Sequence, residues 1–324
     1  MRQISGLPPE IAVLIPCFNE QETIAAVVSA FKAHLPEATI FVYDNASTDG
    51  TIEQARNAGA IVRSEPLRGK GCVVRRMFAD IEADVFVLVD GDGTYDAPSA
   101  SKLIDTLIRE SLDLVSAVRV DSSQKAYRAG HRFGNWLLTG LVAQLFGKRF
   151  SDMLSGYRVM SRRFVKSFPA LSKGFEIETE LTVHALQMRI PIAECPTPYG
   201  ERPEGSSSKL RTISDGVRIM RMIVYLLKEE RPLAFFAALS AFLAILALVL
   251  ALPVIVEFAR TGLVPRLPTA VLATGLMILG SLSLVCGSIL DTVTRGRIEM
   301  KRLNYLSIPI RFRARLAKVD ACRM

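Results

Sequence analysis

The sequence predicts an α/β domain with a doubly wound, mostly parallel β-sheet, followed by an amphipathic helix and two transmembrane helices. Three observations lead to this prediction. Short β-branched runs alternate with helical patterns over residues 11–120, and polar residues or glycines follow several of these runs. Two long runs without a charged residue lie near the C-terminal end. An alternation of strands and helices is typical of a parallel sheet with helices on both faces.

The elements of the predicted sheet follow one another along the chain. Strands are predicted at Ile11–Pro16, Thr39–Asp44, Ala60–Ser64, Val85–Asp90 and Asp113–Val120. Helices are predicted between them, at Gln21–His34, Asp49–Gly59, Gly69–Ala83 and Pro98–Glu110.

Polar residues and glycines cluster where these strands end. They are Asn19 and Glu20, Asp44, Arg68 to Gly71, and Asp90 with Asp92. In open α/β sheets, ligands bind beyond the carboxyl ends of the strands. We therefore expect a binding site at this edge of the sheet.

Asp90-Gly91-Asp92 follows the apolar run Val85–Val89. Two carboxylates one residue apart at a strand exit can share one hard divalent cation, and Mg²⁺ or Mn²⁺ is usually held by such carboxylates together with substrate phosphates. A turn with two solvated aspartates is the alternative. The glycines at 69 and 71 do not complete a dinucleotide-binding fingerprint, and the sequence contains no P-loop motif.

The two apolar runs predict membrane-spanning helices. Leu233–Val256 and Thr269–Leu290 carry no charged residue, and as helices they would be about 36 and 33 Å long, enough to cross a hydrocarbon core of about 30 Å. Buried helices of a soluble core are the alternative. Residues 291–324 hold nine Lys/Arg against three Asp/Glu. The positive-inside tendency then places the body and this tail in the cytoplasm and the loop 257–268 outside.

The segment Thr212–Glu230 is predicted to form an amphipathic helix. Its apolar residues recur at spacings of three and four, and a stripe containing Arg218, Arg221 and Lys228 runs along the opposite face. Such a helix can lie at the membrane interface or pack on the core of the body, and both interpretations remain open.

Charge and cysteine content exclude other classes of protein. The net charge of +8 follows the hydrophobic segments, whereas a nucleic-acid binder usually carries its basic excess on the folded domain. We therefore expect a lipid bilayer as partner and no nucleic acid. The five cysteines form no C-x-x-C pair, which argues against a disulfide scaffold or a zinc module.

The motifs at the strand ends resemble those of the family 2 glycosyltransferases, which have the GT-A fold. The matching segments are Ile15–Glu20, Asp44–Thr51, Arg68–Gly71 and Asp90–Thr94. Further segments, Asp152–Arg158 and Arg202–Leu210, resemble the polyprenyl-phosphate glycosyltransferase branch of the family, which includes dolichyl-phosphate mannose synthase. The resemblance covers about residues 10–230.

This resemblance implies a role for each matching position. Residues expected to bind the nucleotide sugar are Pro16, Asn19, Glu20, Asp44, Lys70 and Asp90. Residues expected to hold Mg²⁺ or Mn²⁺ on the donor diphosphate are Asp90 and Asp92. Basic residues expected to face phosphates are Arg119, Arg132, Arg202 and Lys209, and the catalytic candidates are Asp152, Arg132 and Arg202. Asn45-Ala46 and Thr94 depart from the usual pattern, so the nucleotide and the sugar stay open.

The expected organisation has six parts. These are a GT-A domain at 1–210, an amphipathic juxtamembrane helix at 211–231, transmembrane helices at 233–256 and 269–290, an external loop at 257–268, and a basic cytoplasmic tail at 291–324. The expected protein is a multi-pass enzyme of the inner (cytoplasmic) membrane of the cell envelope. Its catalytic domain would face the cytoplasm.

The expected activity is inverting transfer of a hexose from a nucleotide-diphosphate sugar to a polyprenyl phosphate. Transfer to a hydroxyl of a glycolipid or polysaccharide is an alternative within the same class of enzyme. A non-catalytic nucleotide-sugar-binding scaffold is the alternative from another class, and the retention of Asp90 and Asp92 argues against it. A homo-oligomer is compatible with the sequence.

Overall fold

The computed structural model describes residues 8–121, 140, 150–174, 176–200 and 228–309. The chain divides into two compact units, Met1–Gly216 with Lys301–Met324, and Val217–Met300. Most of the expected amphipathic helix at 211–231 lies outside the described residues, and so do Arg132, Arg202 and Lys209.

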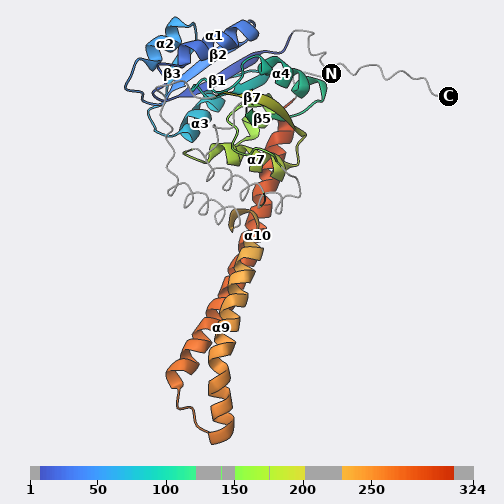
Figure 1. Cartoon of the computed structure of the whole chain (residues 1–324). Coiled ribbons are helices and arrows are strands. Elements are labelled where there is room, and N and C mark those ends of the chain that lie inside the picture. The colour runs from blue at the N-terminus through green and yellow to red at the C-terminus, as the bar shows by residue number, and fades with distance from the viewer. Residues whose placement is uncertain (1–7, 122–139, 141–149, 175, 201–227, 310–324) are drawn as a thin grey trace, which may run out of the picture. The chain divides into compact units, whose positions relative to one another are not determined.

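The first unit is built on a seven-stranded sheet in the order β3-β2-β1-β4-β6-β5-β7 (Figure 1). The strands are β1 Ile11–Cys17, β2 Thr39–Asp44, β3 Ile61–Ser64, β4 Val85–Leu88, β5 Leu114–Asp121, β6 Arg158–Ser161 and β7 Ile192–Tyr199. Only β6 is antiparallel to its neighbours, β4 and β5, whereas the pairs β1–β2, β1–β4, β2–β3 and β5–β7 are parallel. The predicted mostly parallel, doubly wound sheet is confirmed.

Helices cover both faces of the sheet. They are α1 Ile24–His34, α2 Thr51–Asn57, α3 Lys70–Asp80, α4 Ser99–Arg109, α6 Arg162–Ser167 and α7 Ile177–Met188. Side chains alternate between the faces of a strand, so Val13 and Ile15 of β1 pack with α1, α2 and α4, while Ala12 and Leu14 pack with α3, α6 and α7. Two hydrophobic cores therefore hold the sheet between them, and its strand ends stay open to carry polar side chains.

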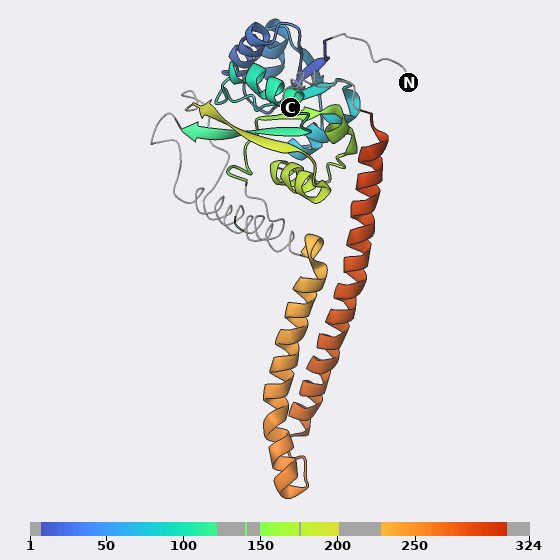
Figure 2. The same cartoon turned by 90° about the vertical axis from the view of Figure 1, so that its right-hand side faces the viewer.

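The second unit contains two long apolar helices, α9 Pro232–Thr261 and α10 Leu267–Ser307. They lie side by side (Figure 2), and the Ser283 hydroxyl of α10 donates to the Phe236 carbonyl of α9 at 3.2 Å. In their most apolar windows the mean hydropathy is 2.9 and 2.0, and only 11% and 17% of the residues are buried. The core helix of a soluble protein would be mostly buried, so exposure and length together favour helices that cross a membrane.

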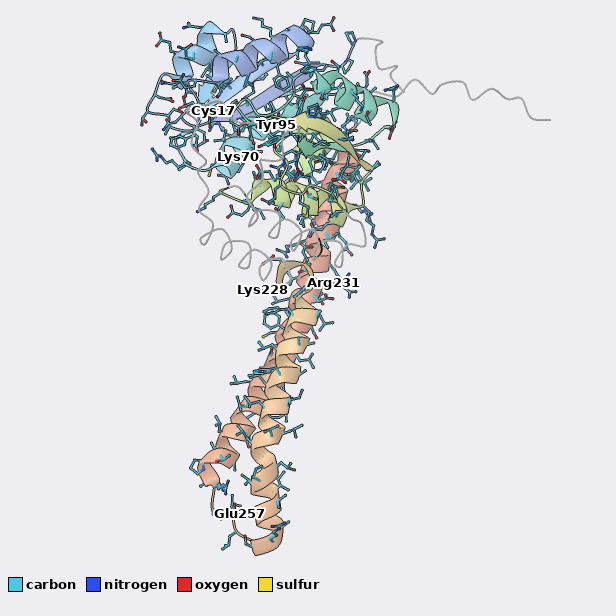
Figure 3. The ribbon with its side chains drawn as sticks, viewed as in Figure 1. Cys17, Lys70, Tyr95, Lys228, Arg231 and Glu257 are labelled. Atoms are coloured by element: carbon cyan, nitrogen blue, oxygen red, sulfur yellow. The ribbon has the colours of Figure 1, made fainter. Side chains whose placement is uncertain are left out.

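Charged residues mark the two ends of α9. Lys228 and Arg231 lie near its start and Glu257 near its end, and the apolar residues lie between them (Figure 3). The predicted runs at 233–256 and 269–290 both fall inside helices. Helix α10 continues past residue 290 to Ser307, so the first part of the expected tail is helical.

The last turns of α10 belong to the first unit, where Tyr305 reaches a buried carboxylate. The Tyr305 hydroxyl donates to Asp113 at 2.5 Å, and Asp113 also accepts from Ser161 at 2.6 Å and from Arg163 at 3.1 Å. The Arg163 guanidinium lies 4.1 Å from the centre of the Tyr305 ring. Because a buried carboxylate needs such partners, Tyr305 contributes to the burial of Asp113 within the first unit.

Candidate functional site

Four of the predicted acidic residues come together around Cys17, the last residue of β1. Burial raises the pKa of the Cys17 thiol well above its ordinary value, and the nearby carboxylates of Glu20, Asp44, Asp90 and Asp92 raise it further. The geometry follows from the sheet, because β1 lies between β2, which ends at Asp44, and β4, which leads into Asp90. The ends of the three strands therefore form one acidic cluster.

The loop after β1 is held in shape by hydrogen bonds to the loop after β2. Asn19 has a φ of 53°, a conformation that asparagine tolerates better than most residues. Its backbone N–H donates to the Ser47 hydroxyl, and its side-chain carbonyl accepts from the Thr48 N–H, both at 2.9 Å. These bonds fix the exit from β1. Pro16 is buried within the strand itself.

Asp44 carries a buried oxygen without a hydrogen-bond donor among the described residues. Its Oδ2 accepts from the Ser47 N–H at 3.1 Å, but no donor among the described residues reaches Oδ1. Buried acceptors in proteins are nearly always paired. A bound N–H group, such as that of a nucleotide base, would satisfy this oxygen.

Lys70 begins α3 at the neighbouring strand end. It follows Gly69, which has a φ of 124° and lies so close to the Lys173 carbonyl that a side chain would not fit. The Asn45 side chain fixes the approach to the helix, because its Oδ1 accepts from the Gly69 N–H at 2.7 Å and its Nδ2 donates to the Leu67 carbonyl at 2.8 Å. The loop and helix start therefore determine where the Lys70 ammonium lies.

The Lys70 ammonium lies between two carboxylates. It forms ion pairs with Asp90 and with Glu178 of α7, the latter at 2.5 Å from Nζ to Oε1. Burial alone would lower the pKa of Lys70, but the two carboxylates outweigh it and raise the pKa above its ordinary value. Lys70 is therefore a permanent cation next to the first aspartate of the D-x-D motif.

The D-x-D motif supplies the oxygen donors that Mg²⁺ and Mn²⁺ prefer. The Asp90 side chain is 27% exposed, while Asp92 is buried and accepts from the Thr94 hydroxyl at 2.6 Å. Asp90 also lies so close to Gly156 that a side chain there would clash. Among the described residues, no three His, Cys, Asp or Glu side chains are arranged so that they could hold a metal ion by themselves. A divalent ion would fit Asp90 and Asp92 only with further ligands from a diphosphate or water.

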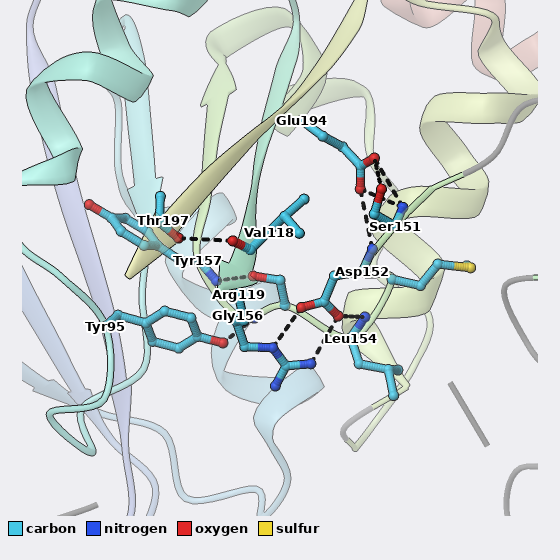
Figure 4. A network of polar contacts seen from close by, with 12 residues as sticks. Tyr95, Val118, Arg119, Ser151, Asp152, Leu154, Gly156, Tyr157, Glu194 and Thr197 are labelled. Carbon is cyan, nitrogen blue, oxygen red and sulfur yellow. Dashed lines mark hydrogen bonds and ion pairs between the residues drawn. The ribbon is translucent and has the colours of Figure 1, made fainter. Parts of the chain in front are cut away.

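Arg119 and Asp152 form a second ion pair (Figure 4). Arg119 of β5 donates through Nε and Nη2 to the two carboxylate oxygens of Asp152, at 2.6 and 2.9 Å. The guanidinium also lies 5.4 Å from the centre of the Tyr199 ring. Bidentate pairing fixes the plane of a guanidinium, so Asp152 orients Arg119.

Glu194 of β7 holds the loop that carries Asp152. Its carboxylate accepts from the Ser151 N–H at 2.9 Å and from the Asp152 N–H at 3.3 Å (Figure 4). At the other end of the loop, the fully buried Arg158 donates to the Met153 carbonyl at 2.9 Å. The position of Asp152 is thus determined at both ends of its loop.

Tyr95 connects the two parts of the site. Its hydroxyl accepts from the Gly156 N–H at 2.8 Å (Figure 4). Burial raises the pKa of Tyr95 above its ordinary value, with a further contribution from Asp90 and opposing effects of Arg119 and Lys70. Because the Asp90 carboxylate also lies against Gly156, this glycine contacts both Tyr95 and the D-x-D motif.

Three residues of this arrangement are absent from the sequence-based prediction. Glu178 and Glu194 follow no motif, and their partners lie far away in the sequence. Glu178 lies in the first turn of α7. Acidic residues are common at this position because they interact favourably with the helix dipole, so Glu178 does not stand out in the sequence. The third is Tyr95, which lies just after the D-x-D motif. The predicted Arg132, Arg202 and Lys209 lie outside the described residues.

Comparisons with known proteins agree with this geometry. A sequence profile described as Glycosyl transferase family 2 matches residues 12–168. The chain is 35% identical to "Glycosyltransferase AglJ" of Haloferax volcanii over 302 residues, which cover 92% of this chain and 99% of that protein. It is 28% identical to the "Dolichyl-phosphate hexose transferase" of the same organism over 222 residues, 68% of this chain and 96% of that protein.

Among solved structures, the fold is similar to glucosyl-3-phosphoglycerate synthase from Mycobacterium tuberculosis. The complex of that enzyme with Mn²⁺, UDP-glucose and phosphoglyceric acid aligns with a TM-score of 0.56 and 24% identity. The alignment covers 68% of this chain and 79% of that one. The same enzyme is also known in complex with Mg²⁺ and UDP.

We predict that Glu194→Gln loosens the loop that carries Asp152. The single oxygen of the amide can keep the Ser151 and Asp152 N–H bonds, but these bonds lose their charged acceptor, and an NH₂ group replaces the second oxygen, which also accepts from Ser151. Hydrogen bonds to charged groups contribute about 1.5–3 kcal/mol, so hydrogen exchange in residues 150–156 should accelerate about tenfold or more. Glu82→Gln, which changes a carboxylate that is 58% exposed, is the matched control. Unchanged exchange in Glu194→Gln would contradict the positioning role of Glu194.

Proposed function

The chain belongs to glycosyltransferase family 2, and we propose that it is a membrane-anchored, inverting member that moves a hexose from a nucleotide-diphosphate sugar to a polyprenyl phosphate. One observation carries the proposal. The carboxylates of Glu20, Asp44, Asp90 and Asp92 lie around Cys17 at the strand ends, and one of them, Asp90, pairs with the Lys70 ammonium. An acidic cluster with an adjoining fixed cation is suited to a metal-bound diphosphate.

The donor's base and diphosphate have separate partners in this proposal. The buried Oδ1 of Asp44 accepts an N–H of the base, which both uracil and guanine offer. Pro16, Asn19 and Glu20 line the same side. Lys70 lies at the diphosphate end, where its positive charge stabilises the leaving nucleotide.

Asp90 and Asp92 are the proposed holders of Mg²⁺ or Mn²⁺. A divalent ion at this position neutralises the negative charge that develops on a departing diphosphate. The structural neighbour from Mycobacterium tuberculosis, which binds Mn²⁺ or Mg²⁺ together with UDP, supports this assignment.

The basic residues of the site are proposed to receive the acceptor phosphate. Arg119 is held by both oxygens of Asp152, so we assign Asp152 mainly to orienting this guanidinium. Arg132, Arg202 and Lys209 are proposed as further phosphate partners. A lipid phosphate has a second pKa of about 6, by analogy with phosphoserine, and is therefore a nucleophile without a strong base. Inversion at the anomeric carbon follows from direct attack on the donor.

A lipid acceptor is supported by α9 and α10. Both helices are long and apolar enough to cross a membrane, and most of their apolar surface is exposed. They would keep the enzyme at the bilayer that contains a polyprenyl phosphate, and a relative carries the name dolichyl-phosphate hexose transferase. We propose that the catalytic unit faces the cytoplasm.

We predict that Asp92→Asn abolishes transfer of labelled sugar into organic-extractable polyprenyl phosphate. The substitution preserves size but removes a charge from the proposed metal site. Asp96→Asn is the matched control, because Asp96 accepts from Ser99 at the start of α4 and takes no part in the proposed chemistry. Robust transfer by Asp92→Asn, or by the wild type in excess EDTA, would contradict the metal assignment. Transfer only to a soluble hydroxyl acceptor would contradict the lipid-phosphate assignment.

We predict opposite labelling of the two ends of α9 in intact cells. In a background without other reactive cysteines, Gly262→Cys in the loop between α9 and α10 should react with an impermeant maleimide from outside. Lys228→Cys, before α9, should react only after the membrane is opened. Labelling of Lys228→Cys from outside would contradict the cytoplasmic orientation.

A further inference from the structure

Glu178 is a buried carboxylate that has no role in the proposed chemistry so far. Its side chain is 6% exposed, compared with 27% for Asp90, the other partner of Lys70. Its Oε1 lies 2.5 Å from the Lys70 Nζ, and no donor among the described residues reaches its Oε2. Burial raises the pKa of Glu178, and Lys70 opposes this effect. A buried carboxylate is costly unless a cation compensates it, so the placement of Glu178 depends on Lys70.

We propose that Glu178 is a positioning residue for the donor site. Glu178 holds the Lys70 ammonium in place, so that Lys70 stays in the site when Asp90 binds the donor and its divalent cation. This inference rests on the proposed function. Asp90 is the more exposed of the two carboxylates and belongs to the D-x-D motif. Of the two partners of Lys70, Asp90 is therefore the one that a ligand would bind. Glu178 is enclosed by protein and stays with Lys70.

Close packing fixes the separation of Glu178 and Lys70. Backbone carbonyls of Ser172 and Lys173 lie against Gly71 and Gly69, at the start of α3, so closely that neither glycine can carry a side chain. The loop with these carbonyls is tied to α7 by Glu180, which accepts from the Leu171 and Ser172 N–H groups at 2.9 and 2.8 Å. The helices that carry Lys70 and Glu178 are therefore joined through a short, tightly packed loop.

The number of charges around Lys70 gives a second reason why the Glu178 carboxylate matters. Lys70 supplies one ammonium group to two carboxylates, Asp90 and Glu178. Removal of the Glu178 charge would leave Lys70 paired with Asp90 alone, and the ammonium would then compete with the donor complex for that carboxylate.

A double-mutant cycle on nucleotide binding tests this role. The affinity of the purified full chain for UDP and for GDP is measured by calorimetry with Mg²⁺, and the tighter ligand is used for all variants. Glu178→Gln should weaken binding about tenfold in the wild-type background. It should have no further effect after Lys70→Met, because the ammonium through which Glu178 acts on the donor site is then absent. Glu178→Asp, which retains the charge, should recover part of the loss.

Glu82→Gln is the control. The Glu82 carboxylate pairs with Arg162 and Lys166 rather than with Lys70, so its effect should be the same with and without Lys70→Met. Equal effects of Glu178→Gln in both backgrounds, or a dependence on Lys70 as large for Glu82→Gln, would overturn the positioning role while leaving nucleotide binding intact. Failure of the wild type to bind either diphosphate would overturn the proposed function as well.

Discussion

The site depends on one shared ammonium group. The Nζ of Lys70 lies between Asp90, which follows β4, and Glu178 of α7, and Lys70 itself begins α3. Buried charges are tolerated only when they are paired. The start of α3, the end of β4 and α7 must therefore pack together before any of these three side chains can be buried. The glycines at 69 and 71 make that arrangement possible, because they let the neighbouring loop approach the start of α3.

The ion pair of Arg119 and Asp152 fixes a second cation of the site in a similar way. Arg119 is fixed by Asp152, and the loop of Asp152 is fixed by Glu194. Lys70 and Arg119, the two cations of the site among the described residues, are each paired with a buried carboxylate. Preorganised charges of this kind stabilise a developing anion without rearranging during the reaction. This is the property that transfer from a nucleotide-diphosphate sugar requires.

The sequence predicted β1 to β5 and α1 to α4 within a few residues, because the alternation of apolar and polar positions is regular there. It did not predict β6 or β7. Strand β6 is only four residues long, and β7 contains Pro196 and Pro198, which are tolerated because β7 lies at the edge of the sheet. Asp90, Asp92 and Lys70 were found from motifs next to strand ends. Glu178 and Glu194 could not be found in this way, because only the folded chain brings them to partners distant in the sequence.

The central claim is that the strand ends recognise a diphosphate together with a divalent cation. Thermal unfolding of the purified chain with UDP, UMP, GDP and GMP, each with and without Mg²⁺, tests this claim most directly. A ligand that binds the native state raises its stability in proportion to RT ln(1 + [L]/Kd). We expect one diphosphate to stabilise the chain strongly only with Mg²⁺, and its monophosphate to give no such stabilisation. Equal stabilisation by monophosphate and diphosphate, or stabilisation independent of the cation, would contradict the claim.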